Sequence, residues 1–263
     1  MLADFQTDKP LTIRCCLNRI TPETLREELE AEGIAVTEHP YLPYAFRISG
    51  YDHLNELEAF RSGCFTVQDV SSMLVAEIAD PQAGYRVIDV CAAPGGKALH
   101  AAEKLAGTGH VDARDLTEYK VGLIEENIGR SGLTNISARQ QDARVCDEAS
   151  VETADIVIAD LPCSGLGVLA TKKDIRYNMT PETQKELAAL QREILSVVHR
   201  YVKPGGTLLY STCTINREEN EENTAWFLEQ HREFTLEKEK QFLPGIDPCD
   251  GFYIAVMKKQ ESK

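Results

Sequence analysis

The chain has 263 residues, of which 43% are hydrophobic and 27% are charged, a composition typical of one or two globular domains with a sizeable core. This composition excludes a disordered chain, a fibrous repeat and a small scaffold held together by disulfides. No uncharged apolar stretch approaches the roughly 20 residues that cross a bilayer, and the first ten residues lack the basic and apolar regions of a signal peptide. We therefore expect a cytoplasmic protein without a membrane partner.

The charge is strongly acidic, with 42 acidic residues against 28 lysines and arginines and a net charge of −14. Because nucleic-acid-binding domains are usually basic, this balance argues against a general nucleic-acid binder, although it is compatible with a local basic groove. The eight cysteines include no C-x-x-C pair. We therefore expect no zinc or other metal site, and most of these thiols should be small buried hydrophobic side chains.

The N-terminal segment, residues 1–63, is predicted to be a small α+β subdomain. The TPET sequence at Thr21 indicates a helix start, with threonine as the N-cap and proline at the first helical position, and the same sequence recurs at Thr180. The predicted elements are a strand at 11–17, a helix at 21–33 and extended chain at 34–49.

Residues 64–263 are predicted to form a doubly wound α/β domain, because strands alternate with helices as in a mostly parallel sheet with crossover helices. Asn216 is expected to cap a late helix, with Glu219 placed to close a capping box. The predicted strands are 85–90, 110–115, 135–140, 154–160, 207–212 and a last one within 251–259; the earlier helices are 97–107, 117–131 and one that begins at Thr180.

Polar and reactive residues follow each predicted strand. In open α/β sheets, ligands bind in the crevice beyond the carboxyl ends of the strands, so these segments should meet at one edge. They are CAAPGGK at 91–97, Asp115, Asp142, ADLPCSGLG at 159–167 and STCT at 211–214.

The first of these loops places Gly95 and Gly96 between a strand and a helix, where backbone can approach a ligand closely. Asp115 lies about 20 residues further on at a strand end, the usual position of an acid that binds ribose hydroxyls. The alternative is that its carboxylate only interacts favourably with the positive end of the dipole of the following helix. No dinucleotide-type glycine loop is present. A nucleoside cofactor such as S-adenosylmethionine is therefore favoured over NAD, and a dehydrogenase is excluded.

Two cysteines stand out among the eight. Cys163 lies in a polar, turn-forming loop, and Cys213 lies between two threonines just past a strand. Both positions are unusual for a packing residue, whereas a thiolate nucleophile needs polar neighbours that lower its pKa. The two cysteines are therefore candidate catalytic residues, while Cys15, Cys64 and Cys146 are expected to be structural.

At this point the sequence resembles the RsmB/Sun family of RNA cytosine-5 methyltransferases. The matching segments cover nearly the whole chain in the family's order. They are FTVQDVSS (65–72), VIDVCAAPGGK (87–97), ADLPCSGLGV (159–168), KPGGTLLYSTCT (203–214), EEN (218–220) and DGFYIA (250–255). The presence of both a Pro-Cys and a Thr-Cys cysteine favours the RNA type over the DNA type.

The resemblance implies a Rossmann-like methyltransferase domain behind an RRM-like N-terminal subdomain. It also implies an S-adenosylmethionine-dependent enzyme that forms 5-methylcytosine in 16S rRNA through a covalent bond between cysteine and carbon 6 of cytosine. Cys213 would be the nucleophile, Cys163 its partner in product release, and Asp160 a contact of both the methionine end and the cytosine ring. The remaining cofactor-binding positions would be Cys91, Ala92, Ala93, Pro94, Gly95, Gly96 and Lys97, with Asp115 at the ribose and Asp142 near the adenine.

The chain also departs from the family pattern. The stretch 169–173 reads LATKK in place of two arginines and a proline, which removes a phosphate contact that Lys172, Lys173 and Arg176 could partly replace. The family's N-terminal NusB-like domain has no counterpart, so the chain is either a fragment or a short form. Two other functions stay open, a tRNA cytosine-5 methyltransferase and a non-catalytic cofactor-binding factor in ribosome assembly. The N-terminal subdomain could contact RNA or only support the larger domain.

Overall fold

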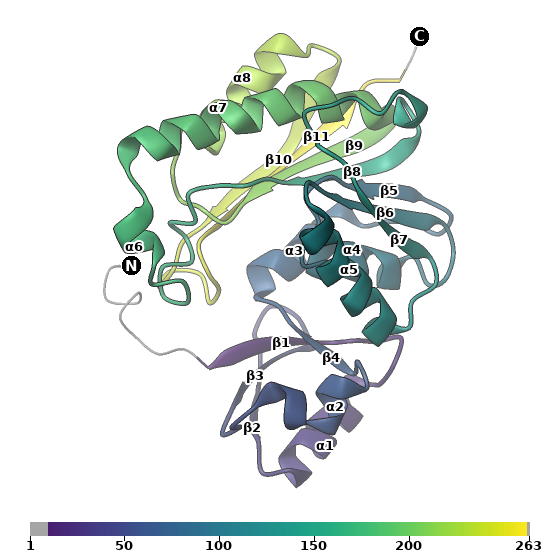
Figure 1. Ribbon diagram of the computed structural model, residues 1–263, viewed down its shortest axis with the longest axis vertical. Coiled ribbons are helices and arrows are strands. Elements are labelled where there is room, and N and C mark those ends of the chain that lie inside the picture. The colour runs from purple at the N-terminus through teal and green to yellow at the C-terminus, as the bar shows by residue number, and fades with distance from the viewer. Residues whose placement is uncertain (1–9, 262–263) are drawn as a thin grey trace.

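The computed structural model describes residues 10–261, which form two separate sheets (Figure 1). The smaller sheet lies at one end of the molecule, and the larger sheet has helices on both faces. Residues 1–9 lie outside the described residues, and so does nearly all of the segment from which we predicted that no signal peptide is present. Within residues 10–261, no helix is both long and apolar enough to cross a membrane.

The small sheet has the strand order β2-β3-β1-β4, and all its neighbouring strands are antiparallel. Thr21 caps the first helix as predicted, because its hydroxyl accepts a hydrogen bond of 3.2 Å from the backbone N–H of Thr24. The division of the chain at residue 63 stays a prediction; β4 lies beyond it and pairs with β1. The elements are β1 (Leu11–Cys15), α1 (Pro22–Ala31), β2 (Ala35–Glu38), β3 (Ala45–Ser49), η2 (Leu54–Glu56), α2 (Glu58–Arg61) and β4 (Phe65–Val67).

One face of this small sheet is turned toward the larger unit. Arg14 on β1 is 1% exposed, donates a 2.9 Å hydrogen bond to the side chain of Gln68 and forms an ion pair with Glu103 on α4 (Gly96–Lys104). RRM domains bind RNA by stacking bases on an accessible sheet face. Because Arg14 is buried against α4, this contact favours a supporting role for the subdomain over base stacking at this position.

The large sheet has the strand order β10-β11-β9-β8-β5-β6-β7. The pairs from β9 to β7 are parallel, and β11 and β10 add antiparallel strands at the other end. This confirms the predicted mostly parallel, doubly wound sheet. The strands are β5 (Arg86–Asp89), β6 (His110–Asp115), β7 (Ile136–Gln140), β8 (Ala154–Asp160), β9 (Val202–Thr212), β10 (Phe234–Phe242) and β11 (Phe252–Lys259).

Helices cover both faces of the large sheet because successive strand residues, which point to opposite faces, are both apolar. Val87 and Ile158 belong to one core cluster, and their neighbours Ile88 and Val157 belong to another. Helices α3, α4 and α5 lie on one side of the large sheet, and α7 and α8 lie on the other (Figure 1). The remaining helices are α3 (Val70–Ala79), α5 (Glu118–Ser131), η3 (Glu148–Ser150), α6 (Ile175–Asn178), α7 (Pro181–Val198), η4 (His199–Tyr201) and α8 (Glu221–Gln230).

Two features of the C-terminal part differ from the sequence prediction. The helix expected at Asn216 begins at Glu221, with Asn220 at the N-cap, and Glu219 closes no capping box because its side chain is buried beneath the loop after β8. In addition, β10 was not predicted. Its charged FTLEKEKQF sequence is mostly exposed and forms a strand by pairing with β11 along the sheet edge.

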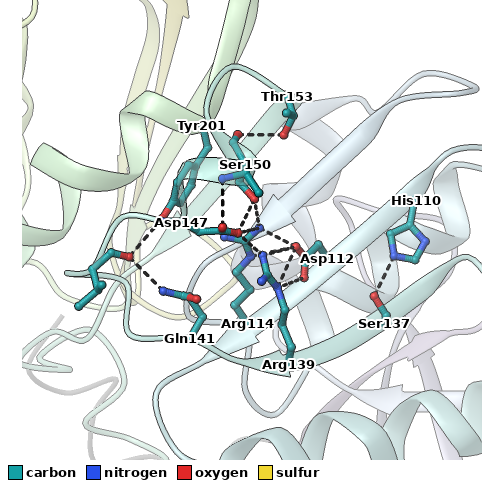
Figure 2. Close-up of polar contacts among 12 residues, drawn as sticks. His110, Asp112, Arg114, Ser137, Arg139, Gln141, Asp147, Ser150, Thr153 and Tyr201 are labelled. Carbon is teal, nitrogen blue, oxygen red and sulfur yellow. Dashed lines mark hydrogen bonds and ion pairs between the residues drawn. The ribbon is translucent and has the colours of Figure 1, made fainter.

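A cluster of charged side chains fixes the chain between β7 and β8 (Figure 2). Arg114 is 1% exposed and donates hydrogen bonds of 2.9 and 2.6 Å to one carboxylate oxygen of Asp112 and a 2.6 Å bond to Ser150. Arg139 bridges Asp112 and Asp147, at 3.1 and 2.6 Å. These contacts join β6, β7 and η3, and they hold the connection against the edge of the sheet.

Candidate active site

The candidate site lies where the winding of the large sheet reverses. In the sheet, β5 is followed by β6 and β7 in one direction, and β8 is followed by β9 in the opposite direction. The loops after the adjacent strands β5 and β8 therefore diverge at this point. Ligands of open α/β sheets bind in the crevice that such a divergence leaves beyond the strands. The loop CAAPGGK follows β5 here, as predicted.

The backbone of this loop depends on glycine. Gly95 is the N-cap of α4 and has a φ of +110°, a backbone angle that residues with a side chain rarely adopt. Its backbone N–H bonds the carbonyl of Ala92 at 2.7 Å, which closes the turn. The turn thereby directs the first backbone N–H groups of α4 toward the crevice, an arrangement that suits a polar or anionic ligand group.

A cleft of about 460 Å³ opens at this point, a size typical of small-molecule sites. One wall is the loop after β5, and the opposite wall comes from the N-terminal subdomain. The lining residues are Pro10, Leu11, Thr12, Tyr51, Val67, Gln68, Asp69, Ser72, Asp89, Cys91, Ala92, Ala93, Pro94, Gly96, Lys97, Asp160, Thr171 and Asp250.

Asp89 is one of the cleft residues that sequence reasoning missed. It ends β5, is 1% exposed, and neither of its carboxylate oxygens forms a hydrogen bond within the described structure. Burial and the nearby charge of Asp160 raise the pKa of Asp89 to about 7, although Lys97 and the backbone N–H of Cys91 act in the opposite direction. The available signal was a carboxylate inside the apolar strand VIDV.

Lys97 and Asp160 form an ion pair on the floor of the cleft, with 2.7 Å between Nζ and Oδ2. The other oxygen of Asp160 accepts a 2.8 Å hydrogen bond from the hydroxyl of Ser211 on β9. Burial lowers the pKa of Lys97, but Asp160 outweighs this effect and the net shift is upward, so the ammonium keeps its proton. The pair therefore places a fixed positive and a fixed negative charge at the junction of β5, β8 and β9.

The two candidate catalytic cysteines lie side by side. Cys163 follows β8 and Cys213 follows β9, and their Sγ atoms are 3.1 Å apart. With the Cys163 thiol as donor, this contact holds the pKa of Cys213 below its usual value; burial and Asp160 oppose the shift, while Lys97 and Lys172 support it. The same hydrogen bond, together with burial, raises the pKa of Cys163. The pKa values of the two thiols thus shift in opposite directions, and Cys213 is the one whose thiolate is favoured.

Asp115 and Asp142 do not line the cleft. Asp115 is 3% exposed and accepts hydrogen bonds from the backbone N–H groups of Ala93, at 3.0 Å, and Leu116, at 2.8 Å. Asp142 lies beyond β7 and forms an ion pair of 2.8 Å with Arg144. Asp115 therefore supports the loop after β5 directly. The predicted contacts of Asp115 with ribose and of Asp142 with adenine stay predictions.

The metal prediction likewise stays untested. Among residues 10–261, one group of side chains has ligand atoms close enough to share an ion, namely His199, His231 and Glu233. The two imidazole rings have centroids 3.9 Å apart, and the ring of Phe227 lies 4.6 Å from that of His231. These contacts are those of an aromatic cluster at the ends of α7 and α8, outside the cleft.

A model of the family described as 16S rRNA methyltransferase RsmB/F matches residues 76–258. The chain belongs to this family. It is 39% identical over 254 residues to the probable ribosomal RNA small subunit methyltransferase B of Bacillus subtilis, covering 90% of this chain. It is 34% identical to the ribosomal RNA small subunit methyltransferase F of Cronobacter sakazakii, covering 95%. The chain spans 57% of the length of each of these two RsmB/F relatives.

Solved structures share the fold of this chain. The crystal structure of PH0851 has a TM-score of 0.95 and 31% identity, covering 98% of this chain and 61% of that one. NSun6 from Pyrococcus horikoshii, crystallised with SFG, has a TM-score of 0.90 and covers 99% of this chain and 94% of its own. At 24% identity, the likeness to NSun6 shows a common fold only. The Rossmann-like methyltransferase fold predicted from the sequence is confirmed.

Proposed function

We propose that this chain is an S-adenosylmethionine-dependent RNA methyltransferase that forms 5-methylcytosine in 16S rRNA. The proposal rests mainly on the pair of thiols, Cys163 and Cys213, which lie 3.1 Å apart beside the Lys97–Asp160 ion pair. Membership of the RsmB/F family supports both the reaction and the substrate class. A substrate of this kind would be met in the cytoplasm, where ribosomal RNA is found in bacteria.

The cleft fits the proposed cofactor. Bound S-adenosylmethionine would supply a methyl group on a sulfonium, which is electrophilic. Its amino-acid end carries an ammonium group, and the buried, unpartnered carboxylate of Asp89 lines the cleft where such a group could bind. The loop residues Cys91 to Lys97 would hold the cofactor by backbone contact, with Asp115 supporting the loop through the N–H of Ala93.

Cys213 would activate the cytosine. Carbon 5 of the ring is a weak nucleophile; when the Cys213 thiolate forms a bond to carbon 6, the displaced electron pair makes carbon 5 reactive. Asp160 lies beside this cysteine. If its carboxylate takes up a proton when the substrate binds, it would donate a hydrogen bond to ring N3, where negative charge develops during the addition. Lys97 would keep Asp160 oriented and would stabilise the thiolate before it attacks, since it lowers the pKa of Cys213.

Cys163 would assist product release. After methylation, carbon 5 loses its proton to a base, the double bond between carbons 5 and 6 forms again, and the sulfur of Cys213 leaves carbon 6 with the bonding electron pair. A thiol that keeps its proton 3.1 Å away can donate a hydrogen bond to this departing thiolate. Loss of Cys163 is therefore expected to slow release more than addition.

The test is transfer of labelled methyl from S-adenosylmethionine to unmodified 16S rRNA, with digestion of the product to nucleosides. We expect label in 5-methylcytidine, no transfer by Cys213→Ala, and a covalent protein–RNA adduct with Cys163→Ala. Cys146→Ala, in the loop after β7, is the matched control and should keep wild-type activity. Full activity of Cys213→Ala would overturn the assignment of the nucleophile.

Two other outcomes would redirect the proposal. Transfer to unmodified tRNA but not to 16S rRNA would identify the chain as a tRNA cytosine-5 methyltransferase. A non-catalytic assembly factor would bind the cofactor but transfer no methyl group to either RNA. This result would have to persist when the part of an RsmB/F relative that this chain does not match is supplied as a separate chain. The stretch LATKK at 169–173 favours that second outcome, because it lacks the arginines of the family pattern.

A further inference from the structure

Glu219 is a buried carboxylate for which the proposed chemistry has no role. It is 0% exposed and accepts four hydrogen bonds, none of them from the helix that follows. Two come from Ser164, the residue after Cys163: its backbone N–H at 2.9 Å and its hydroxyl at 2.5 Å. The other two come from the side-chain amides of Gln191, at 3.0 Å, and Asn216, at 3.1 Å.

The same carboxylate reaches the second cysteine through Ser164. The hydroxyl of Ser164 is 2.7 Å from that of Thr214, the residue after Cys213. Because the proton of Ser164 is directed at Glu219, its oxygen accepts the proton of Thr214 in this contact. Glu219 is therefore linked by hydrogen bonds to the residue that follows each thiol.

Asn220 completes the arrangement around Cys213. Its side-chain oxygen accepts a 2.5 Å hydrogen bond from the hydroxyl of Thr212, and its amide donates a 3.1 Å bond to the carbonyl of Thr214. The residues on both sides of Cys213 are thus bonded to one side chain. Asn220 occupies the N-cap position of α8, yet its side chain makes no capping hydrogen bond. Its amide also donates a 2.7 Å hydrogen bond to the side chain of Gln241 on β10, so its side-chain hydrogen bonds go to the cysteine segment and to β10, not to the helix.

We propose that Glu219 and Asn220 are positioning residues that hold Cys163 and Cys213 at their working separation. The inference rests on the proposed function for its catalytic meaning, but the separation itself can be measured without methyl transfer. A buried carboxylate with four donors is a rigid anchor, because charge-assisted hydrogen bonds are short and removing any donor leaves charge unpaired. Displacements of about 1 Å in such supporting residues can cost about 100-fold in rate.

The test compares Glu219→Gln with Glu218→Gln. Both variants lose one negative charge from adjacent residues, but Glu218 is exposed and Glu219 is fully buried. In Glu219→Gln, one carboxylate oxygen becomes an amide that faces donors, so the contacts to Ser164 and Asn216 cannot all persist. We expect kcat for 5-methylcytosine formation to fall about 100-fold with KM for RNA within about threefold, while Glu218→Gln matches the wild type.

A direct readout of the thiol pair separates positioning from general damage. Diamide oxidises two neighbouring thiols to a disulfide, taking up two electrons and two protons, and the rate depends on the distance between the sulfur atoms. We expect disulfide formation between Cys163 and Cys213 to slow at least tenfold in Glu219→Gln. The pH midpoint for alkylation of Cys213 by iodoacetamide should also rise, because the hydrogen bond from Cys163 is weakened.

Unchanged kcat, oxidation rate and alkylation midpoint in Glu219→Gln would overturn the inference. If that variant fails to fold, Ser164→Ala removes the link between Glu219 and Thr214 with the loss of one hydroxyl, and it should show smaller changes in the same direction. If the wild type methylates no RNA but the two thiol readouts still respond to Glu219→Gln, the positioning role stands and the proposed function fails.

Discussion

Replacing Asp89 by asparagine should stabilise the cofactor-free protein in neutral and alkaline solution. The carboxylate is buried at the end of β5 without a hydrogen bond, which raises its pKa from the ordinary 3.8 to about 7. Well below pH 3.8 the group is protonated in both the folded and the unfolded chain. As the pH rises from about 4 to 7, the unfolded chain releases this proton while the folded protein retains it, so the free energy of unfolding falls.

The size of this effect follows from the pKa difference. At about 1.4 kcal/mol per pH unit, the raised pKa of Asp89 lowers the free energy of unfolding by about 4 kcal/mol above pH 7 and by about 2 kcal/mol at pH 5. Asparagine has nearly the same shape and no charge, and its own hydrogen-bonding cost does not change with pH. The stability of Asp89→Asn relative to wild type should therefore increase by about 2–3 kcal/mol between pH 5 and pH 8.

Urea unfolding at pH 5, 6, 7 and 8 measures this difference, with the exposed carboxylate variant Asp52→Asn as control. The control should show no pH-dependent gap from wild type. Adding S-adenosylmethionine at pH 8 should stabilise the wild type more than Asp89→Asn, because only the wild type offers a carboxylate to the ligand ammonium. A gap between Asp89→Asn and wild type that stays constant from pH 5 to pH 8 would refute the reasoning.

Three further predictions concern the polar cluster, a close backbone contact and the nucleophile. Asp112→Ala leaves the buried Arg114 guanidinium without its main partner and should lower the free energy of unfolding by about 3 kcal/mol. Arg26→Gln, at an exposed ion pair, should leave the free energy of unfolding nearly unchanged, and equal effects of the two substitutions would contradict this reading. A Cβ at Gly167 would lie 1.9 Å from the carbonyl oxygen of Gly251 and 2.8 Å from that of Cys213. Gly167→Ala should therefore displace the cysteine segment and reduce kcat about 10- to 100-fold. Gly122→Ala, where an added Cβ meets open space on α5, should leave kcat unchanged. Lys97→Met should raise the pH midpoint for alkylation of Cys213, because a cation that lowers the pKa of this thiol is lost. Lys185→Met should leave that midpoint unchanged. An unchanged midpoint in Lys97→Met would show that Lys97 does not stabilise the thiolate.

The sequence alone predicted the elements that local rules control. Strand and helix periodicity indicated the order of the Rossmann-like domain, and the caps at Thr21 and Thr180 are formed as predicted because an N-cap requires only residues within one turn. The polar loops after the strands were expected at one edge because parallel strands share their direction. Motif order was enough to indicate the family.

The tertiary structure decided what depends on neighbours distant in the sequence. Strand β10 forms because β11 supplies its hydrogen bonds, and Glu219 leaves its expected capping position because Ser164 and Gln191 offer it buried donors from two other segments. The 3.1 Å approach of Cys163 to Cys213 likewise needs the pairing of β8 with β9. Burial and charge at such contacts set the pKa values of Asp89 and Cys213, and these quantities depend on three-dimensional proximity that no local pattern in the sequence encodes.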